Sequence, residues 1–568
     1  TSTGLDGDYT IKANQGSKIK YSFLGTKSVT VTAGGSTTIN VTLEDDAMGL
    51  EEVVVQAFGT AKKKDLTGSV SSIDSKLISS QSNSTLSKAL EGSIPGLQVS
   101  SVDGQPGTDM GIRIRGIGTA SQNNANALIV IDGVPNTNSN VLATLNPKDV
   151  ESITVLKDAA STALWGSRGA NGVVMVTTKK GQQGKARITF EGRWGINMTG
   201  NNQAKIIDNP GELYENAWQS IYNSVRYGSN QNYTTNVANP NMTHEEAALF
   251  ASQHLFNYTG KPNTFDAKNT LGNWLLYDVP GLTDASNLTP TGSGANLSST
   301  LNNIFLVGTD GKLNPNARLM YNDNWEDEVY QKSFRQEYNV TVSGATDKTD
   351  YYLSLGYLQD PSYFVSSKFE RYNLRSNINT QVTKWLKAGV NMAYSRRTQQ
   401  AMAVRWGRNP GTVNQNLFNW LYGRNMLTQM WERNADGSLV YENGEKVFIK
   451  SNGQQVSPLG YTTARYNNYD LLYMLDNDKS EYTYNDLNMV GYLEAKFLKN
   501  FTFRANMAVD QTFGMQKRYA NNVTGDSQSY GGTMGRYYSD YMNINAQQTL
   551  TWAHDYGKHH VDALIGHE

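Results

Sequence analysis

From Arg187 onward, the sequence is dominated by segments about ten residues long in which apolar and polar side chains alternate. In the first of them, Ile188 and Phe190 fall on one face of an extended chain, while Thr189 and Glu191 fall on the other. Nine candidate strands share this pattern: 188–195, 338–343, 351–357, 372–380, 386–395, 487–497, 501–509, 542–552 and 560–567. This length and this period of two are typical of strands that cross a membrane in a closed barrel.

The connections between these strands alternate between short and long. Short turns are predicted at 345–348, 383–385, 498–500 and 555–558, and long connections at 361–369, 396–484 and 510–540. Short turns at one end and long loops at the other are the layout of an outer-membrane barrel. A soluble β-sandwich needs neither strands of this length nor this asymmetry. The sequence therefore predicts an all-β, antiparallel membrane barrel over 183–568, with long loops at one end.

Composition restricts the remaining classes. Lysine plus arginine number 50 and aspartate plus glutamate 51, so the net charge of −1 offers no field that would recruit nucleic acid. There are no cysteines, which excludes disulfides and Cys-ligated zinc. The longest apolar stretches, such as 127–131 and 173–176, are far short of the roughly 18 residues that a spanning helix needs. The six histidines form no HExxH or triad setting, so we expect no enzyme, no metal site and no cofactor.

The first 64 residues divide into two parts. Residues 1–46 contain short β-type runs separated by glycine and asparagine, and they predict part of a small β-sandwich. Residues 47–64 form a segment around Leu-Glu-Glu-Val-Val-Val-Gln (50–56), with no evident pairing partner in the chain. Local sequence leaves two interpretations of this segment open. It is either a linker strand or a strand offered to another protein by β-augmentation.

Residues 65–182 predict a mixed α/β unit. A helix begins near Ser84 or Thr85, where either side chain would cap it. The segment 111–116 predicts a strand with isoleucines on one face and Arg113 and Arg115 on the other. Further strands are expected at 127–135 and 172–178, and a helical turn leads into a strand over 147–156.

At this point the chain resembles the SusC-like branch of TonB-dependent transporters. The motifs that carry the resemblance follow one another in order: EEVVVQAFGT (51–60), LTGSV (66–70), LEGSIPGLQV (90–99), GQPG (104–107), IRIRG (112–116), VIDGVP (130–135), NPKDV (146–150), ESITVLKD (151–158) and GSRGANGVVMVTT (166–178). Each motif alone is weak, but nine in sequence order are specific. The early module, 1–46, resembles the carboxypeptidase-regulatory-like extension that such transporters carry.

The resemblance implies a bacterial outer-membrane protein. Residues 65–182 would be a plug in the lumen of a barrel of about 22 strands, of which nine lie in this sequence and roughly thirteen do not. The TonB box would be Glu51, Glu52, Val53, Val54, Val55 and Gln56, pairing with the periplasmic energy transducer TonB. A SusD-like lipoprotein would cover the outer mouth, and such transporter–lipoprotein pairs can form dimers. Outer-membrane lipid would surround the barrel.

Within this architecture we expect two groups of functional residues. The plug motifs contain Arg113, Arg115, Asp132, Arg168 and Asn171, and the three arginines either pair with carboxylates on the barrel wall or are ordinary packing charges. The long loop 396–484 contains Trp406, Arg408, Trp420, Tyr422 and Trp431. Aromatic rings with arginines suit contacts to a sugar or a peptide, whereas the alternatives are packing within the loop and contacts to the lid lipoprotein.

The expected function is TonB-dependent import of a nutrient, with an oligosaccharide as the leading substrate. Import of peptides by the same machinery is the alternative. A non-transporting receptor or adhesin barrel is the alternative of another class, but it has no use for an energy-coupling strand. A soluble surface hydrolase would need a carboxylate pair or triad, which the sequence does not show.

Overall fold

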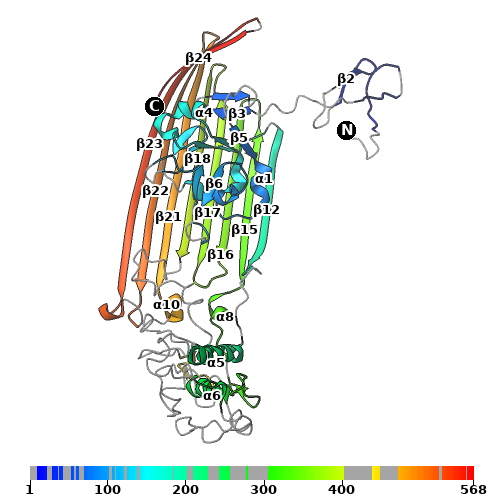
Figure 1. Ribbon diagram of the computed structural model, residues 1–568. Helices are drawn as coiled ribbons and strands as arrows, with labels where there is room; N and C mark the ends of the chain where they lie inside the picture. The colour runs from blue at the N-terminus through cyan, green and yellow to red at the C-terminus, as the bar shows by residue number, and fades with distance from the viewer. Residues whose placement is uncertain are drawn as a thin grey trace.

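The computed structural model places a curved antiparallel sheet around a smaller α/β domain, with helices beyond one end of the sheet (Figure 1). It describes residues 9–21, 29–35, 38–42, 53–56, 59–62, 70–100, 105–108, 110–119, 125–136, 141–182, 184–200, 207, 209–227, 242–255, 277–278, 305–320, 322–401, 431, 438–447, 471–523, 527–557 and 559–568. Within these residues, no helix has the length and apolar character needed to cross a membrane.

The large sheet has nine strands that pair with their neighbours in chain order, all antiparallel. They are β12 (Gly184–Asn197), β15 (Ser333–Ala345), β16 (Thr349–Pro361), β17 (Lys368–Gln381), β18 (Leu386–Ala401), β21 (Lys479–Phe497), β22 (Phe501–Ala520), β23 (Thr533–Tyr556) and β24 (His559–His567). The nine predicted strands are therefore confirmed. Short turns join them at one end, here called the turn end, and long connections leave the other, here called the loop end (Figure 1).

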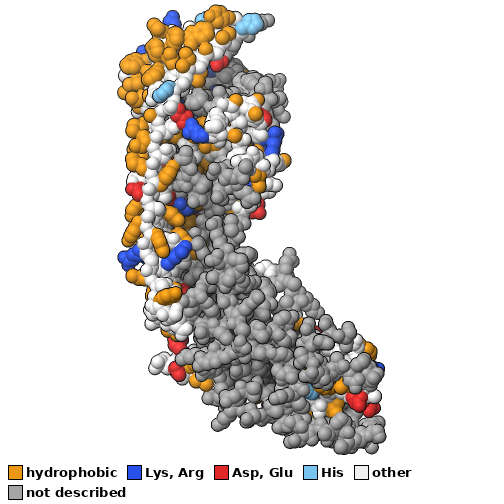
Figure 2. All heavy atoms as spheres, turned by 60° about the vertical axis from the view of Figure 1, so that its left-hand side comes forward, with side chains coloured by type: hydrophobic (Ala, Val, Ile, Leu, Met, Phe, Trp, Pro, Cys, Tyr) orange, Lys and Arg blue, Asp and Glu red, His pale blue; other side chains and the backbone are white. Residues whose placement is uncertain are grey.

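Alternation along each strand gives the sheet two different faces. One row of paired residues runs Phe190, Val340, Leu355, Leu374 and Tyr394 across five strands. The adjacent row on the opposite face runs Glu191, Asn339, Gly356, Asn373 and Ser395. Phe190 and Leu355, on the convex face, are 66% and 53% exposed. Figure 2 shows many hydrophobic side chains along the outer edge of the sheet, with polar and charged ones between them. A face of this kind is stable only against an apolar medium such as lipid.

Aromatic rings gather on the convex face toward the loop end. Trp194, Tyr338, Tyr357 and Tyr372 lie on four consecutive strands, with ring centroids 6.0, 6.4 and 4.9 Å apart in that order. The indole Nε1 of Trp194 donates a hydrogen bond of 3.0 Å to the hydroxyl of Tyr338. Rings with one polar end are favoured where lipid meets water, so this row marks one membrane boundary.

The domain inside the curve of the sheet has its own core. Its five-stranded sheet has the order β5 (Val70–Asp74), β10 (Val150–Leu156), β11 (Val173–Thr178), β8 (Leu128–Ile131) and β9 (Val134–Asn136). A separate hairpin pairs β6 (Leu97–Ser100) with β7 (Gly111–Ile114). The helices are α1 (Ser75–Ser80), α2 (Leu86–Ala89), α3 (Val141–Thr144) and α4 (Ala159–Thr162), and the 3₁₀ segments are η3 (Pro147–Asp149) and η4 (Ala163–Gly169).

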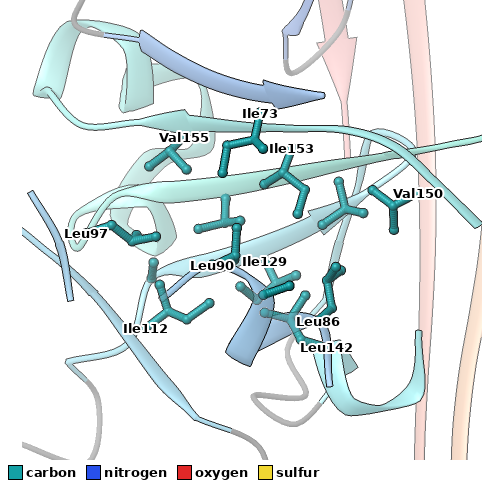
Figure 3. Packing of buried hydrophobic residues seen from close by; sticks show 14 of the residues in the cluster. Ile73, Leu86, Leu90, Leu97, Ile112, Ile129, Leu142, Val150, Ile153 and Val155 are labelled. Atoms are coloured by element: carbon teal, nitrogen blue, oxygen red, sulfur yellow. The ribbon is translucent and has the colours of Figure 1, made fainter. Parts of the chain in front are cut away.

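This core is formed by the apolar faces of its strands and by α2. Leu86, Leu90, Ile153 and Val155 have no exposed surface, and Figure 3 shows them converging. Burying side chains of this size removes about 1.5–3 kcal/mol each of unfavourable hydration. The Thr85 hydroxyl accepts from the Lys88 amide, so Thr85 is the cap of α2.

The remaining elements lie outside the inner domain and the large sheet. N-terminal to the inner domain, β1 (Lys18–Tyr21) pairs with β2 (Val29–Thr32), and β3 (Val53–Gln56) pairs with β4 (Gly59–Lys62). Beyond the loop end lie α5 (Pro210–Tyr227), α6 (His244–His254), β13 (Tyr277–Asp278), β14 (Arg318–Leu319), α8 (Trp325–Val329), β19 (Tyr441–Glu442), β20 (Glu445–Lys446), α10 (Leu471–Asn477) and η8 (Gln528–Tyr530). Helices α5 and α6 pack through a shared core around Trp218 and Tyr222.

Candidate functional site

The inner domain contacts the concave face of the sheet mainly through polar groups, and Asp132 is at the centre of one cluster. Its carboxylate accepts from the backbone amide of Thr178 at 2.9 Å and from the Thr178 hydroxyl at 2.7 Å. The other donor is the guanidinium of Arg375 on β17, at 3.0 Å. Both charged side chains are buried, at 8% and 3% exposed. Asp132 also takes a φ of 49°, which Asp tolerates better than most residues in a tight turn.

A second set of contacts joins side chains of β17 to main-chain carbonyls of the inner domain. Arg371, which is 1% exposed, donates to the Ser84 carbonyl at 2.7 Å and to the Ala143 carbonyl at 3.3 Å. Asn373 donates to the Thr144 carbonyl at 2.9 Å, and Asn377 donates to the Lys179 carbonyl at 2.8 Å. These donors therefore bind main-chain carbonyls just before α2, in α3 and just after β11.

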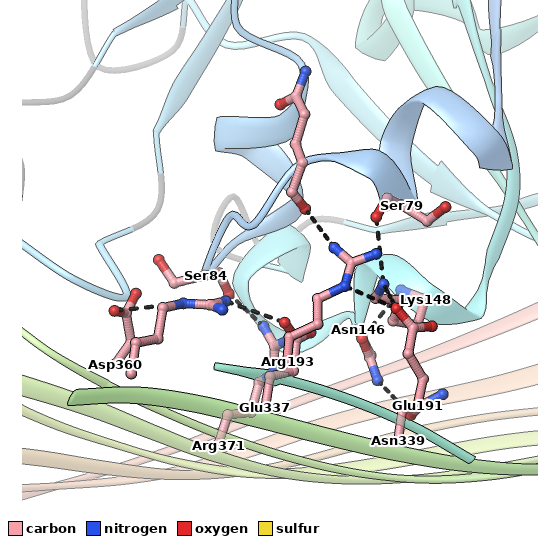
Figure 4. Close-up of polar contacts among 12 residues, drawn as sticks. Ser79, Ser84, Asn146, Lys148, Glu191, Arg193, Glu337, Asn339, Asp360 and Arg371 are labelled. Atoms are coloured by element: carbon pink, nitrogen blue, oxygen red, sulfur yellow. Dashed lines mark hydrogen bonds and ion pairs between the residues drawn. The ribbon is translucent and has the colours of Figure 1, made fainter. Parts of the chain in front are cut away.

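A charged cluster holds η3 and the end of α1 against β12 (Figure 4). The Lys148 ammonium lies 2.5 Å from Glu191 and also donates to the Ser79 carbonyl at 3.3 Å. Arg193 shares Glu191 at 2.8 Å and reaches the Gln81 carbonyl at 3.4 Å. Burial lowers the pKa of the Lys148 ammonium, while the neighbouring Glu191 acts to raise it.

Two further polar contacts lie on either side of Lys148. The side-chain amide of Asn146 donates to Asn339 of β15 at 3.1 Å. The hydroxyl of Tyr352 on β16 donates to the carboxylate of Asp149 at 2.9 Å. The segment 146–149 therefore contacts three consecutive strands, β12, β15 and β16, which makes it the most extensively bonded part of the interface described here.

The glycine loop 105–108 contacts the wall near the loop end. A Cβ placed on Gly107 would lie only 2.0 Å from the ring of Phe369, so the two groups are already in contact. Gln399 of β18 donates to the Pro106 carbonyl and to the Thr108 hydroxyl, both at 3.0 Å. Because Gly107 also has a φ of +78°, no other residue fits this position without strain.

The plug arginines singled out from the sequence occupy different settings. Arg168 forms an ion pair of 2.6 Å with Glu568, which follows β24. Arg113 and Arg115 form no ion pair within the part of the chain that the structure describes. The amide of Arg115 instead donates to the Gly96 carbonyl at 2.9 Å. Asn171 lies half-buried beside Gly118.

None of the wall residues in these contacts was predicted from the sequence: the donors Arg371, Asn373, Arg375, Asn377 and Gln399, and the ring of Phe369. A signal for them exists, because every second residue from 371 to 379 is arginine or asparagine. One face of an otherwise alternating strand therefore contains only strong hydrogen-bond donors, which predicts a partner rich in acceptors.

Of the loop residues proposed as contacts, Trp406, Arg408, Trp420 and Tyr422 lie outside the described residues. Trp431 is described, and it lines a cavity of about 310 Å³. The other lining residues are Glu328, Val365, Glu445, Lys446, Leu475 and Asp476. The Lys446 ammonium lies 4.5 Å from the centroid of the Trp431 ring and 3.2 Å from Glu328. Burial raises the pKa of the Asp476 carboxyl; the nearby Lys479 acts to lower it, and Glu328 and Glu445 act to raise it.

The strand 53–56 has a partner in the chain, contrary to the expectation from its sequence. Val53–Gln56 pairs antiparallel with Gly59–Lys62, with Val54 opposite Ala61 and Val55 opposite Thr60. Glu51 and Glu52 lie outside the described residues. The partner was not evident from the sequence because 59–62 contains a glycine and lacks the alternation of a typical strand.

A long antiparallel sheet, apolar outside and polar inside, with an α/β domain bonded to its concave face, defines a plugged outer-membrane β-barrel. Residues 62–173 match the family of the TonB-dependent Receptor Plug Domain. Together with the relatives described next, this match places the chain in the SusC-like family of TonB-dependent transporters.

Three relatives support this assignment. TonB-dependent receptor P26 of Formosa agariphila is 31% identical over 422 residues, which are 74% of this chain and 34% of that protein. TonB-dependent receptor SusC of Bacteroides thetaiotaomicron is 40% identical over 206 residues, covering 35% and 20%. TonB-dependent receptor P3 of F. agariphila is 24% identical over 575 residues, covering 100% of this chain and 45% of that protein. The chain thus spans less than half the length of these relatives.

A solved structure shares the fold. The RagAB peptide importer in its open-open state superposes with a TM-score of 0.58 and 20% identity, over 91% of this chain and 48% of that one. The superposition shows that the two chains have the same fold over the matched residues.

Proposed function

We propose that the protein imports a nutrient across the outer membrane by TonB-dependent active transport. The observation that carries this proposal is the polar seal between plug and wall. Asp132, Lys148 and the carbonyls of 84, 143, 144 and 179 are all bonded to the inner face of the barrel. Cargo cannot pass while these bonds hold, so passage requires work on the plug.

The segment 51–56 is the proposed point at which this work enters. It precedes the plug, it contains three consecutive valines, and residues 53–56 already adopt a strand. A strand presents main-chain groups to a partner whatever its side chains are, which suits capture by the periplasmic domain of TonB. This interpretation replaces that of a passive linker.

The proposed cargo is an oligosaccharide, delivered under a SusD-like lipoprotein that closes the outer mouth. Trp431 is the described loop residue best suited to contact it, because its indole can stack on a sugar ring while the neighbouring carboxylates accept hydrogen bonds from the sugar hydroxyls. Peptides are the second candidate. The solved relative RagAB is described as a peptide importer, and the same cavity holds four ionisable side chains: Glu328, Glu445, Lys446 and Asp476.

Energy coupling is tested by replacing residues 51–56 with six glycine and serine residues in the full-length transporter. We expect nutrient uptake to be lost while the barrel remains in the outer membrane. The matched control replaces Val53, Val54 and Val55 with isoleucines, which retain strand propensity and should retain uptake. Normal uptake by the glycine–serine variant would refute the proposed coupling.

The cargo and the lid are tested by native mass spectrometry of the transporter purified from its own membrane in detergent. A lipoprotein partner with a glycan ladder would support import of oligosaccharides. A lipoprotein with bound peptides would support the same transport mechanism with peptides, not oligosaccharides, as the cargo. Recovery of the transporter with no lipoprotein would contradict the proposed lid.

A further inference from the structure

The strand proposed to couple to TonB is closed into a hairpin. Four residue pairs join β3 to β4, from Val53 opposite Lys62 at the open end to Gln56 opposite Gly59 at the turn. Among the described residues, β3 and β4 pair only with each other. In Figure 1 the label β3 lies at the level of the turn end, the end at which the chain enters the plug.

An isolated two-stranded hairpin of this size is only marginally stable in water, because no third strand or helix buries its faces. Even a marginally stable hairpin can protect the edge of a strand. An unpaired strand containing three valines exposes a row of free amides and carbonyls that would pair with unrelated chains. Pairing with β4 satisfies one edge of β3 with groups from the same chain. The hairpin is therefore stable enough to protect the strand and weak enough to open.

The register also determines how the hairpin responds to a pull. A force that draws the residues before Val53 away from the plug acts first on the pair Val53–Lys62, because the plug follows Lys62. These two residues face each other at the open end, so the load falls on one residue pair at a time and the strands separate in sequence. Once open, the ten residues 53–62 can span up to about 33–36 Å.

We propose that the β3–β4 hairpin is a retracted, self-paired form of the coupling strand, and that the strand must separate from β4 before the periplasmic partner captures it. This inference rests on the proposed function of 51–56. It adds that capture is an exchange of strands, in which the edge of the partner replaces Gly59–Lys62. The proportion of open hairpins then limits the apparent affinity for the partner.

A covalent lock provides the test. Residues 1–568 contain no cysteine, and Val54 and Ala61 are opposite each other, so the double variant Val54→Cys/Ala61→Cys can form a disulfide across the hairpin. The full-length transporter would be oxidised in detergent, the cross-link verified by mass, and binding of the C-terminal periplasmic domain of TonB measured by calorimetry. We expect oxidation to weaken binding at least tenfold and reduction to restore it. The single variants Val54→Cys and Ala61→Cys, treated identically, should bind equally before and after oxidation.

The possible results distinguish a failure of this inference from a failure of the proposed function. Undiminished binding by the cross-linked protein would overturn the proposal and leave energy coupling through 51–56 intact. Failure of the two cysteines to cross-link would contradict the hairpin itself. If the unmodified transporter does not bind the TonB domain, the proposed function fails and this inference fails with it.

A second variant shifts the equilibrium in the opposite direction. Thr60→Pro/Ala61→Pro removes the amide donors of two consecutive residues of β4 and leaves the sequence of β3 unchanged. Opening the hairpin in this way should tighten binding of the TonB domain by about five- to tenfold, if the closed form holds 80–90% of the molecules. Lys62→Gln, which keeps the backbone pairing, is the control. Equal or weaker binding by the proline variant would contradict the proposal.

Discussion

Removing the charge of Asp132 while retaining its shape tests how the plug is held. In Asp132→Asn, the side chain can still accept a hydrogen bond from Thr178, but Arg375 is left buried without an opposite charge. Breaking one partner of a buried ion pair costs about 3–5 kcal/mol, mostly because the remaining charge is desolvated. In the double variant Asp132→Asn/Arg375→Met no such charge remains. We therefore expect the double variant to be more stable than the sum of the single changes by about 2–3 kcal/mol.

Native-state hydrogen exchange of the full-length transporter in detergent measures this effect, because the amides of β8 and β11 exchange when the plug opens. Since 1.4 kcal/mol corresponds to a factor of ten, Asp132→Asn should lower their protection by about a hundredfold to a few thousandfold. Lys157→Gln is the control within the plug, because Lys157 makes only an exposed hydrogen bond to the Pro95 carbonyl. If Asp132→Asn lowers protection no more than Lys157→Gln does, the buried pair does not hold the plug.

Three further changes test other parts of the structure. Gly107→Ala would place a Cβ against the ring of Phe369 and should lower plug stability by about 1–3 kcal/mol, visible as a lower Tm. Gly92→Ala, with a φ of +67° and no atom within 4 Å, should have a smaller effect, and equal losses would contradict the steric argument. Burial raises the pKa of Asp476 in the folded protein, so its contribution to stability is complete at low pH and is lost as the pH rises through the raised pKa. Hydrogen exchange of α10 should therefore be slower at pH 4 than at pH 7 after correction for intrinsic rates, and Asp476→Asn should reduce that difference to the part contributed by Asp478, whose pKa burial also raises. Finally, Ile153→Ala removes a fully buried side chain and should cost about 2–5 kcal/mol in denaturant unfolding of the plug, whereas a loss below 1 kcal/mol would indicate a site that collapses.

The strands of the barrel could be predicted because their signal is local. A period of two between apolar and polar residues needs no knowledge of the neighbouring strands. The same rule explains why two strands were predicted too short. Strands β22 and β23 extend to 501–520 and 533–556, well beyond the predicted 501–509 and 542–552. Toward the loop end, the ion pair between Lys517 and Glu481 interrupts the apolar face, although Phe513 and Tyr519 continue it and the hydrogen-bonded ladder extends past it.

The plug–wall contacts were harder to predict, because the sequence does not indicate which group each side chain will meet. Pairing between plug arginines and wall carboxylates was one of two interpretations, and Arg168 with Glu568 has that form. Arg371 and Arg375 reverse it, since the cation lies on the wall and the acceptors lie on the plug. Most of these acceptors are backbone carbonyls, which every residue has and no motif reports. The pairing of β3 with β4 was missed for the same reason, because it is a main-chain contact.

Recognition of backbone carbonyls has a consequence for how such a protein can diverge. Arg371, Asn373 and Asn377 bind the plug at Ser84, Ala143, Thr144 and Lys179 without contacting those side chains through the bonds described. A substitution at any of the four positions leaves its carbonyl in place, so the hydrogen bonds from the barrel wall can persist while the plug sequence changes. The two parts can then change at different rates, and the wall has to preserve only a few donors for a plug of altered sequence to seat in the same way.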